Sequence, residues 1–226
     1  MDKAIVLCDG GINSAVVAAR ARRNADVRLL FVDHGQAAAG AQHRAVEALA
    51  ERLKATSTAI ELPHVGRFLN VRREARADAN TVERHTQSPS DIPGLMWAML
   101  SAGFQLALRS GAATLQTGAS ELADEFETES APGAGSPDHR RDFFYLSNLL
   151  MEHLQSGRIR VVLETPLIDL ARDEIIKLGV RYETPFELLW SCKSSSRAPC
   201  GICRGCIARA KAFSAANILD PASAVV

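Results

Sequence analysis

Four cysteines lie within fifteen residues near the end of the chain, at Cys192, Cys200, Cys203 and Cys206. The Cys-x-x-Cys-x-x-Cys run lets short turns point successive thiolates at one tetrahedral ion, and Cys192 can complete the shell. A shell made only of thiolates leaves no position for water, so zinc bound here would be structural rather than catalytic. Two disulfides or an iron–sulfur cluster are the alternatives that this spacing leaves open.

A second group of residues with chemical potential lies at 9–14, where the sequence is Asp-Gly-Gly-Ile-Asn-Ser. Glycines let the backbone turn tightly, and the N–H groups at the start of a following helix point at phosphate oxygens. The hydroxyl of Ser14 can add a donor. The pattern predicts an anion-binding loop, although a plain tight turn has the same appearance. Cys8, directly before the loop, is either a nucleophile or a buried residue at the end of a strand.

The elements that must position these groups alternate between strands and helices. We expect strands over 4–8, 26–32, 57–62, 113–118 and 158–164, and helices over 13–23, 39–54, 94–110, 138–155 and 171–179. This alternation predicts an α/β fold, a parallel sheet with helices on both faces. Ligands of such sheets bind beyond the carboxyl ends of the strands. The loops at 9–14 and 33–36 should therefore lie at one edge.

Composition limits the classes of function. The 226 residues include 26 basic and 26 acidic side chains, so direct binding to nucleic acid is not expected. No apolar run approaches the length of a membrane span, and the first residues do not resemble an export signal. Clustered, reduced cysteines then indicate a cytoplasmic protein. Two polar stretches, 64–93 and the acidic 121–135, are expected to be functional loops, lids or disordered insertions.

Five motifs in the same order resemble those of the 7-cyano-7-deazaguanine synthase family of PP-loop ATP pyrophosphatases. The loop at 9–14 resembles the family's Ser-Gly-Gly-x-Asp-Ser, and 33–36, Asp-His-Gly-Gln, resembles its Asp-Tyr-Gly-Gln. The stretch 136–140, Ser-Pro-Asp-His-Arg, is similar to Tyr-Pro-Asp-Cys-Arg, and 165–167 matches Thr-Pro-Leu. The cysteine-rich segment is similar to the zinc-binding end of the family.

The resemblance implies a Rossmann-like fold of the adenine nucleotide alpha hydrolase type. It implies a nucleotide-binding domain over 1–185 and a zinc-binding segment over 186–226. The implied reaction uses ATP and Mg²⁺ to adenylate the carboxylate of 7-carboxy-7-deazaguanine. Ammonia then gives the amide and the nitrile, or a protein amine gives a conjugate, as the resemblance implies for some relatives of the family. A homodimer is also implied.

The same resemblance assigns residues to roles. Catalytic roles fall to Asp9, Asn13, Ser14 and Arg172. Nucleotide binding falls to Cys8, Asp9, Gly10, Gly11, Ile12, Asn13, Ser14, Asp33, Gly35, Gln36 and Gly118. Binding of the deazapurine falls to Pro93, Gly94, Asp138, His139 and Arg140, although Asp138 could instead cap a helix.

The chain departs from the family at the predicted nucleotide loop. Asp9 stands where the family has serine, Asn13 where it has aspartate, and Arg172 where it has lysine. A carboxylate about 4 Å from a phosphate is repelled by about 1–4 kcal/mol, unless Mg²⁺ bridges the two groups. Alternatively, Asp9 caps the following helix and Asn13 points into solvent.

These departures leave two main hypotheses, an active ATP-dependent ligase and an inactive module that binds a nucleotide, a deazapurine or a partner protein. Another adenylating enzyme on the same fold, such as a sulfur-transfer or amidating ligase, is a third.

Overall fold

The structure is a computed structural model that describes residues 2–68, 94–122, 137–157 and 160–222. The described residues form a five-stranded sheet in the order β3-β2-β1-β4-β5, with every neighbouring pair parallel. The strands are β1 (Asp2–Leu7), β2 (Ala25–Asp33), β3 (Thr56–Glu61), β4 (Thr114–Gln116) and β5 (Val162–Glu164). The predicted parallel α/β fold is therefore confirmed.

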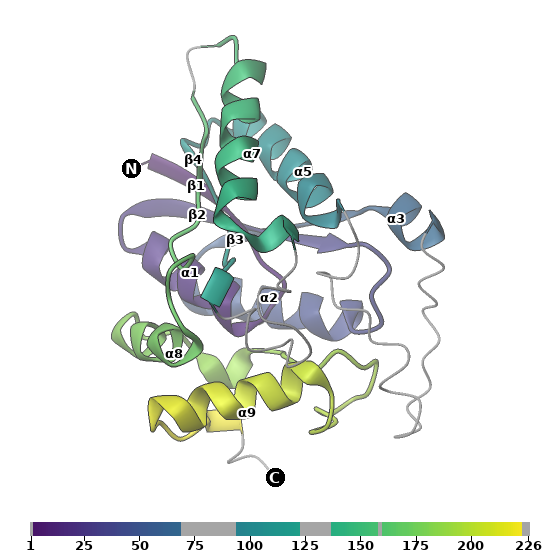
Figure 1. Ribbon diagram of the computed structural model, residues 1–226, viewed down its shortest axis with the longest axis vertical. Helices are drawn as coiled ribbons and strands as arrows, with labels where there is room; N and C mark the ends of the chain where they lie inside the picture. The colour runs from purple at the N-terminus through teal and green to yellow at the C-terminus, as the bar shows by residue number, and fades with distance from the viewer. Residues whose placement is uncertain (1, 69–93, 123–136, 158–159, 223–226) are drawn as a thin grey trace.

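Helices cover both faces of this sheet (Figure 1). The described helices are α1 (Ile12–Arg22), α2 (Ala39–Leu53), α3 (Pro63–Phe68), α5 (Leu95–Ser110), α7 (Arg141–Leu154), α8 (Arg172–Arg181) and α9 (Arg204–Ala216), with 3₁₀ turns η2 (Pro137–His139) and η3 (Phe186–Leu188). Among them, none is long and apolar enough to cross a membrane.

Alternating side chains of β1 build two cores, because successive residues of a strand point to opposite faces. Val6 packs with Val16 of α1 and Leu49 of α2, whereas Leu7 packs on the other face with Leu100 of α5. A central parallel strand that is buried on both faces explains the uninterrupted apolar run at the start of the chain.

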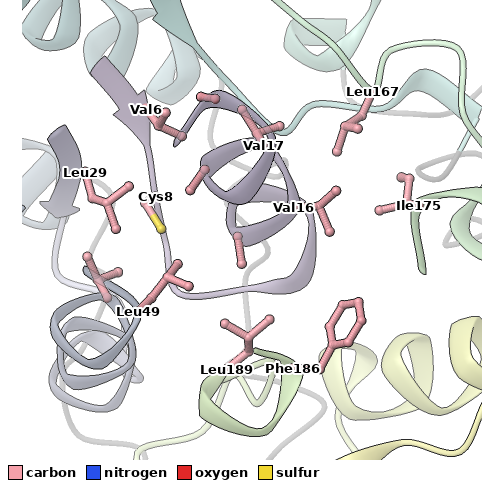
Figure 2. Close-up of a cluster of buried hydrophobic side chains, with 14 of the residues drawn as sticks. Val6, Cys8, Val16, Val17, Leu29, Leu49, Leu167, Ile175, Phe186 and Leu189 are labelled. Atoms are coloured by element: carbon pink, nitrogen blue, oxygen red, sulfur yellow. The ribbon is translucent and has the colours of Figure 1, made fainter. Parts of the chain in front are cut away.

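The last part of the chain joins the core on the α1 side of the sheet. Figure 2 shows Phe186 and Leu189 in the same apolar cluster as Val16 and Ile175. Phe186 also contacts Phe213 of α9 edge to face, with ring centroids 5.1 Å apart. The segment that carries the cysteines is thus anchored on the sheet. The predicted division into a nucleotide-binding domain over 1–185 and a zinc-binding segment over 186–226 remains a prediction.

Three expected boundaries differ from the structure by more than two residues. The helix expected from residue 138 begins at Arg141, because Arg140 has an extended backbone with φ −88° and ψ 155°. Among the described residues of the strand expected over 158–164, only Val162–Glu164 form β5, and the predicted polar loop from residue 64 begins inside α3. Pro93, most of the 64–93 stretch and most of the 121–135 insertion lie outside the described residues.

Candidate functional site

The four cysteines of the C-terminal segment converge as predicted. One sulfur atom from each of Cys192, Cys200, Cys203 and Cys206 lies within 4.8 Å of the other three. Sγ of Cys203 is 3.9 Å from that of Cys192 and 3.6 Å from that of Cys206. Zinc–sulfur bonds of about 2.3 Å in a tetrahedron place the sulfurs roughly 3.8 Å apart. The cluster therefore fits a single tetrahedral metal ion such as zinc.

Disulfides are wrong as an account of this cluster. A disulfide needs sulfurs about 2.05 Å apart, and all four cysteines are free thiols. Hydrogen bonds from Cys203, Ser194 and the backbone N–H of Cys200 hold the pKa of the Cys192 thiol well below its usual value. Metal binding requires thiolates, so this environment favours the form that a metal needs.

The predicted anion-binding loop lies between β1 and α1, and its donors are partly engaged by Asp9. Oδ1 of this exposed carboxylate accepts the backbone N–H of Gly11 at 2.9 Å and the hydroxyl of Ser14 at 2.7 Å. Asp9 thus has a local role close to the capping alternative, although its partners are Gly11 and a side chain rather than N–H groups of the first helical turn. Two donors suited to an anion already have a carboxylate partner.

Asn13 does not point into solvent, so that alternative is wrong. Its Nδ2 donates to the carbonyl of Gly118 at 3.0 Å, which joins α1 to the segment after β4. A Cβ at Gly118 would lie 2.7 Å from the backbone N of Ser14. This close approach explains the glycine, and it brings the predicted nucleotide-binding residues of β1 and β4 together.

The loop after β2 meets the same edge of the sheet. Oδ1 of Asp33 accepts the N–H of Gly35, whose φ is +94°, at 2.8 Å. Gln36 donates to Oε1 of Gln42 at 3.1 Å. The backbone carbonyl of Gln42 would lie 2.8 Å from a Cβ at Gly10. The predicted nucleotide-binding residues at the ends of β1, β2 and β4 therefore lie together.

Cys8 lies beneath this group, and its burial disfavours a nucleophilic role. Its Sγ is 3.6 Å from the hydroxyl of Ser14. Burial, with a further contribution from Asp9, raises the pKa of the Cys8 thiol to about 12. The thiol therefore stays protonated at neutral pH, in line with a buried residue at a strand end.

The residues predicted to bind the deazapurine surround the start of α5 and η2. Gly94 precedes α5 with a φ of +81°. Asp138, which is 7% exposed, accepts the backbone N–H of Met96 at 3.4 Å, so it interacts with the start of α5. His139 is half-buried, and Arg140 is exposed near Glu121, with 3.9 Å between Nε and Oε1.

Arg172 begins α8, which packs against α1 and α9, and it is half-buried. Its catalytic role stays a prediction.

Three residues outside the predicted site connect its parts. The backbone N–H of Trp190 donates to the carbonyl of Gly10 at 2.9 Å and so joins the cysteine segment to the loop. Arg209, 8% exposed, holds the preceding turn through the carbonyls of Leu189 and Phe186. Lys193 follows the first cysteine. In the sequence, the one signal that could have identified these residues is their short distance along the chain from the cysteines.

Several known proteins are similar to this chain along most of its length. The chain is 33% identical to the 7-cyano-7-deazaguanine synthase of Koribacter versatilis (strain Ellin345), over 97% of this chain and 92% of that protein. It is 29% identical to the synthase of Methanothrix thermoacetophila over 98% of each chain. Among solved structures, NMN synthetase from Francisella tularensis is similar with a TM-score of 0.49 and 16% identity, over 86% of this chain and 66% of that chain.

A family model described as queuosine biosynthesis protein QueC matches residues 3–217, nearly the whole described fold from β1 to the end of α9. The chain belongs to the QueC family.

Proposed function

We propose that this protein uses ATP to adenylate the carboxylate of a 7-deazaguanine for attack by an amine. The single observation that supports this most is the similarity to 7-cyano-7-deazaguanine synthases along nearly the entire chain. The meeting of β1, β2 and β4 loops at one edge of the sheet adds to it, since α/β folds bind ligands there.

Adenylation converts a carboxylate oxygen, which is a poor leaving group, into part of AMP, which is a good one. A carboxylate oxygen of the deazaguanine attacks the α-phosphorus of ATP, and the bond to pyrophosphate breaks. The amine then attacks the carboxyl carbon, and AMP leaves with the oxygen. Ser14 and the backbone N–H groups at the start of α1 would bind phosphate oxygens, and Mg²⁺ bound with the nucleotide would neutralise charge on the pyrophosphate.

We also propose that the metal in the four-cysteine site is zinc. Bound zinc would hold the segment in shape, because four thiolates leave no position for water. Sulfurs 3.6–3.9 Å apart favour one ion over a cluster of several irons, which would separate the thiolates further.

A second copy of the chain is the proposed partner in a homodimer. The outer face of α7 exposes large apolar side chains, among them Tyr145 at 64%, Leu146 at 62% and Leu150 at 44%. The same patch on both copies could form a two-fold interface. Light scattering should give a dimer for the wild type and a monomer for Leu146→Glu, and a monomeric wild type would contradict the proposal.

An inactive binding module is the second candidate, because Asp9 already binds two donors of the loop. ATP-dependent release of pyrophosphate, measured with 7-carboxy-7-deazaguanine and ammonium, separates the two candidates. We expect turnover that needs both substrates. No release with Mg²⁺ or Mn²⁺, from protein that contains its full complement of zinc, would favour the inactive module. The variant Asp9→Ser with Asn13→Asp would then show whether the loop is the defect.

A further inference from the structure

Lys193 is fixed in place by the cysteine segment. Its backbone N–H donates to Sγ of Cys203 at 3.4 Å, and the residue is half-buried. A Cβ at Gly205, at the start of α9, would lie 3.5 Å from Cε of Lys193 and 1.9 Å from the carbonyl oxygen of Ser191. The backbone of α9 therefore lies directly against this lysine, and the path of its methylene stem is constrained.

The same lysine lies close to the loop at 9–14. Trp190, three residues earlier, binds Gly10 through its backbone N–H at 2.9 Å. Three residues span at most about 10 Å, and the lysine stem adds further reach. The ammonium group can therefore reach the edge of the sheet at which the loops of β1, β2 and β4 meet.

His34, at the end of β2, lies within the electrostatic reach of both Lys193 and Asp9. Burial is the main cause that lowers the pKa of His34; Lys193 lowers it further, whereas Asp33 and Asp9 raise it. Lys193 and Asp9 therefore act with opposite sign on the same buried histidine at the end of β2.

His34 also carries a buried polar atom without a partner at this edge, among the described residues. The residue is 5% exposed, and among the described residues its Nδ1 has no hydrogen-bond partner. An unpaired buried nitrogen costs free energy unless a ligand or water binds it.

Asp9 makes a nearby cation necessary for phosphate binding. Its exposed carboxylate adds negative charge beside the N–H groups at the start of α1, where phosphates would lie. We propose that Lys193 binds the phosphate groups of the nucleotide and offsets the charge of Asp9. This inference rests on the proposed function, since it assumes that a nucleotide binds the loop. The cysteine segment then contributes a binding side chain as well as holding the fold.

Calorimetric titrations with MgATP, inorganic pyrophosphate and adenosine test the inference on protein that contains its metal. Lys193→Met should weaken binding of MgATP and pyrophosphate about tenfold or more and leave adenosine unchanged. It should also flatten the salt dependence of MgATP binding. Lys193→Arg should retain most of the affinity. Lys3→Met is the matched control, because Lys3 lies at the opposite end of β1, where Nζ donates to the carbonyl of Ser110.

Metal content and melting temperature of each variant show whether the fold is intact, and Lys193→Gln replaces the Met variant if that variant loses metal. Unchanged pyrophosphate affinity in the variant would overturn the inference while leaving the proposed function standing. Equal losses for adenosine and MgATP would also overturn it, because they would indicate a structural role. A wild type that binds adenosine but neither MgATP nor pyrophosphate would overturn both proposals.

Discussion

The four-cysteine cluster and the loop at 9–14 use their polar groups in opposite ways. In the cluster, four sulfur atoms converge on a common centre and are suited to a single ion. In the loop, Gly11 and Ser14 converge on an acceptor that the chain itself supplies, the carboxylate of Asp9. An anion at the loop must therefore compete with Asp9 for these two donors, whereas a metal ion in the cluster has no such competitor among the described residues.

The two regions are nevertheless connected. Trp190 packs against Cys192 and Cys203, and its backbone N–H binds Gly10. A change in the cluster should thus affect the loop, whereas a change at the exposed Asp9 should leave the cluster intact.

Loss of the metal should have the greatest effect on stability. Cys203→Ser, or removal of the metal with a chelator, should lower the melting temperature by about 10 °C or more, because metal binding contributes directly to folding. Calorimetry together with metal analysis measures this. Cys8→Ala is the control, since it removes a buried thiol outside the cluster. Equal effects of the two variants would show that the cluster is an ordinary part of the core.

Arg209→Met should have the next largest effect, about 2–3 kcal/mol, because it leaves a partly buried carboxylate without its cation. Nε and Nη2 of Arg209 each lie 2.7 Å from an oxygen of Asp220. The arginine also donates to the carbonyls of Leu189 and Phe186, directly before Trp190. Urea unfolding measures the loss. Arg160→Met, at an exposed pair with Glu152, should cost less than about 1 kcal/mol.

Acid should reduce the contribution of the Arg209–Asp220 pair. Burial acts to raise the pKa of Asp220, but the hydrogen bonds from Arg209 and Ala222 outweigh it, so the pKa lies below its usual 3.8. The pair therefore stabilises the fold above about pH 4, and its contribution is lost as the pH falls through the lowered pKa. The difference between wild type and Arg209→Met should narrow towards pH 2, and a constant difference would contradict this.

Asp9→Ser should affect binding more than stability. The change frees the N–H of Gly11 from a charged acceptor and should tighten MgATP or pyrophosphate binding about tenfold, with about 1 kcal/mol lost in stability. Titration calorimetry measures the affinity. Asp9→Asn keeps a hydrogen-bond acceptor but removes the charge. It therefore separates the contribution of the hydrogen bonds from that of the charge. Weaker binding in both variants would show that Asp9 assists the nucleotide, for example through Mg²⁺.

His34 should give the smallest effect, a mild dependence of stability on pH. Burial is the main cause that lowers its pKa, so the folded state favours the neutral ring. The unfolded chain takes up a proton near pH 6.5, and stability should fall below that pH by at most about 1.4 kcal/mol per pH unit. The free energy of unfolding of His34→Gln should change less between pH 7.5 and 5.5. His153→Gln, at an exposed histidine, should retain the dependence of the wild type.

Local patterns in the sequence were sufficient for the sheet and for the cysteine cluster. An apolar run before Asp9 and the regular alternation of strands and helices predicted the parallel fold, and the spacing of the cysteines predicted their convergence. The partner of Asn13 could not be found in this way, because the carbonyl of Gly118 is brought to it by tertiary packing. The burial of His34 was hidden for a similar reason, since its sequence neighbours are polar.

The hydrogen bond between Trp190 and Gly10 has a consequence for synthesis of the protein on the ribosome. Residue 10 emerges early, but its partner is translated only after β1, β2, β4 and β5 have been made. Contacts between residues so distant in sequence form late, because closing a long loop costs entropy before the contact repays it. The nascent chain can therefore form its first strand early, but it acquires the complete edge of the sheet only when the cysteine segment arrives.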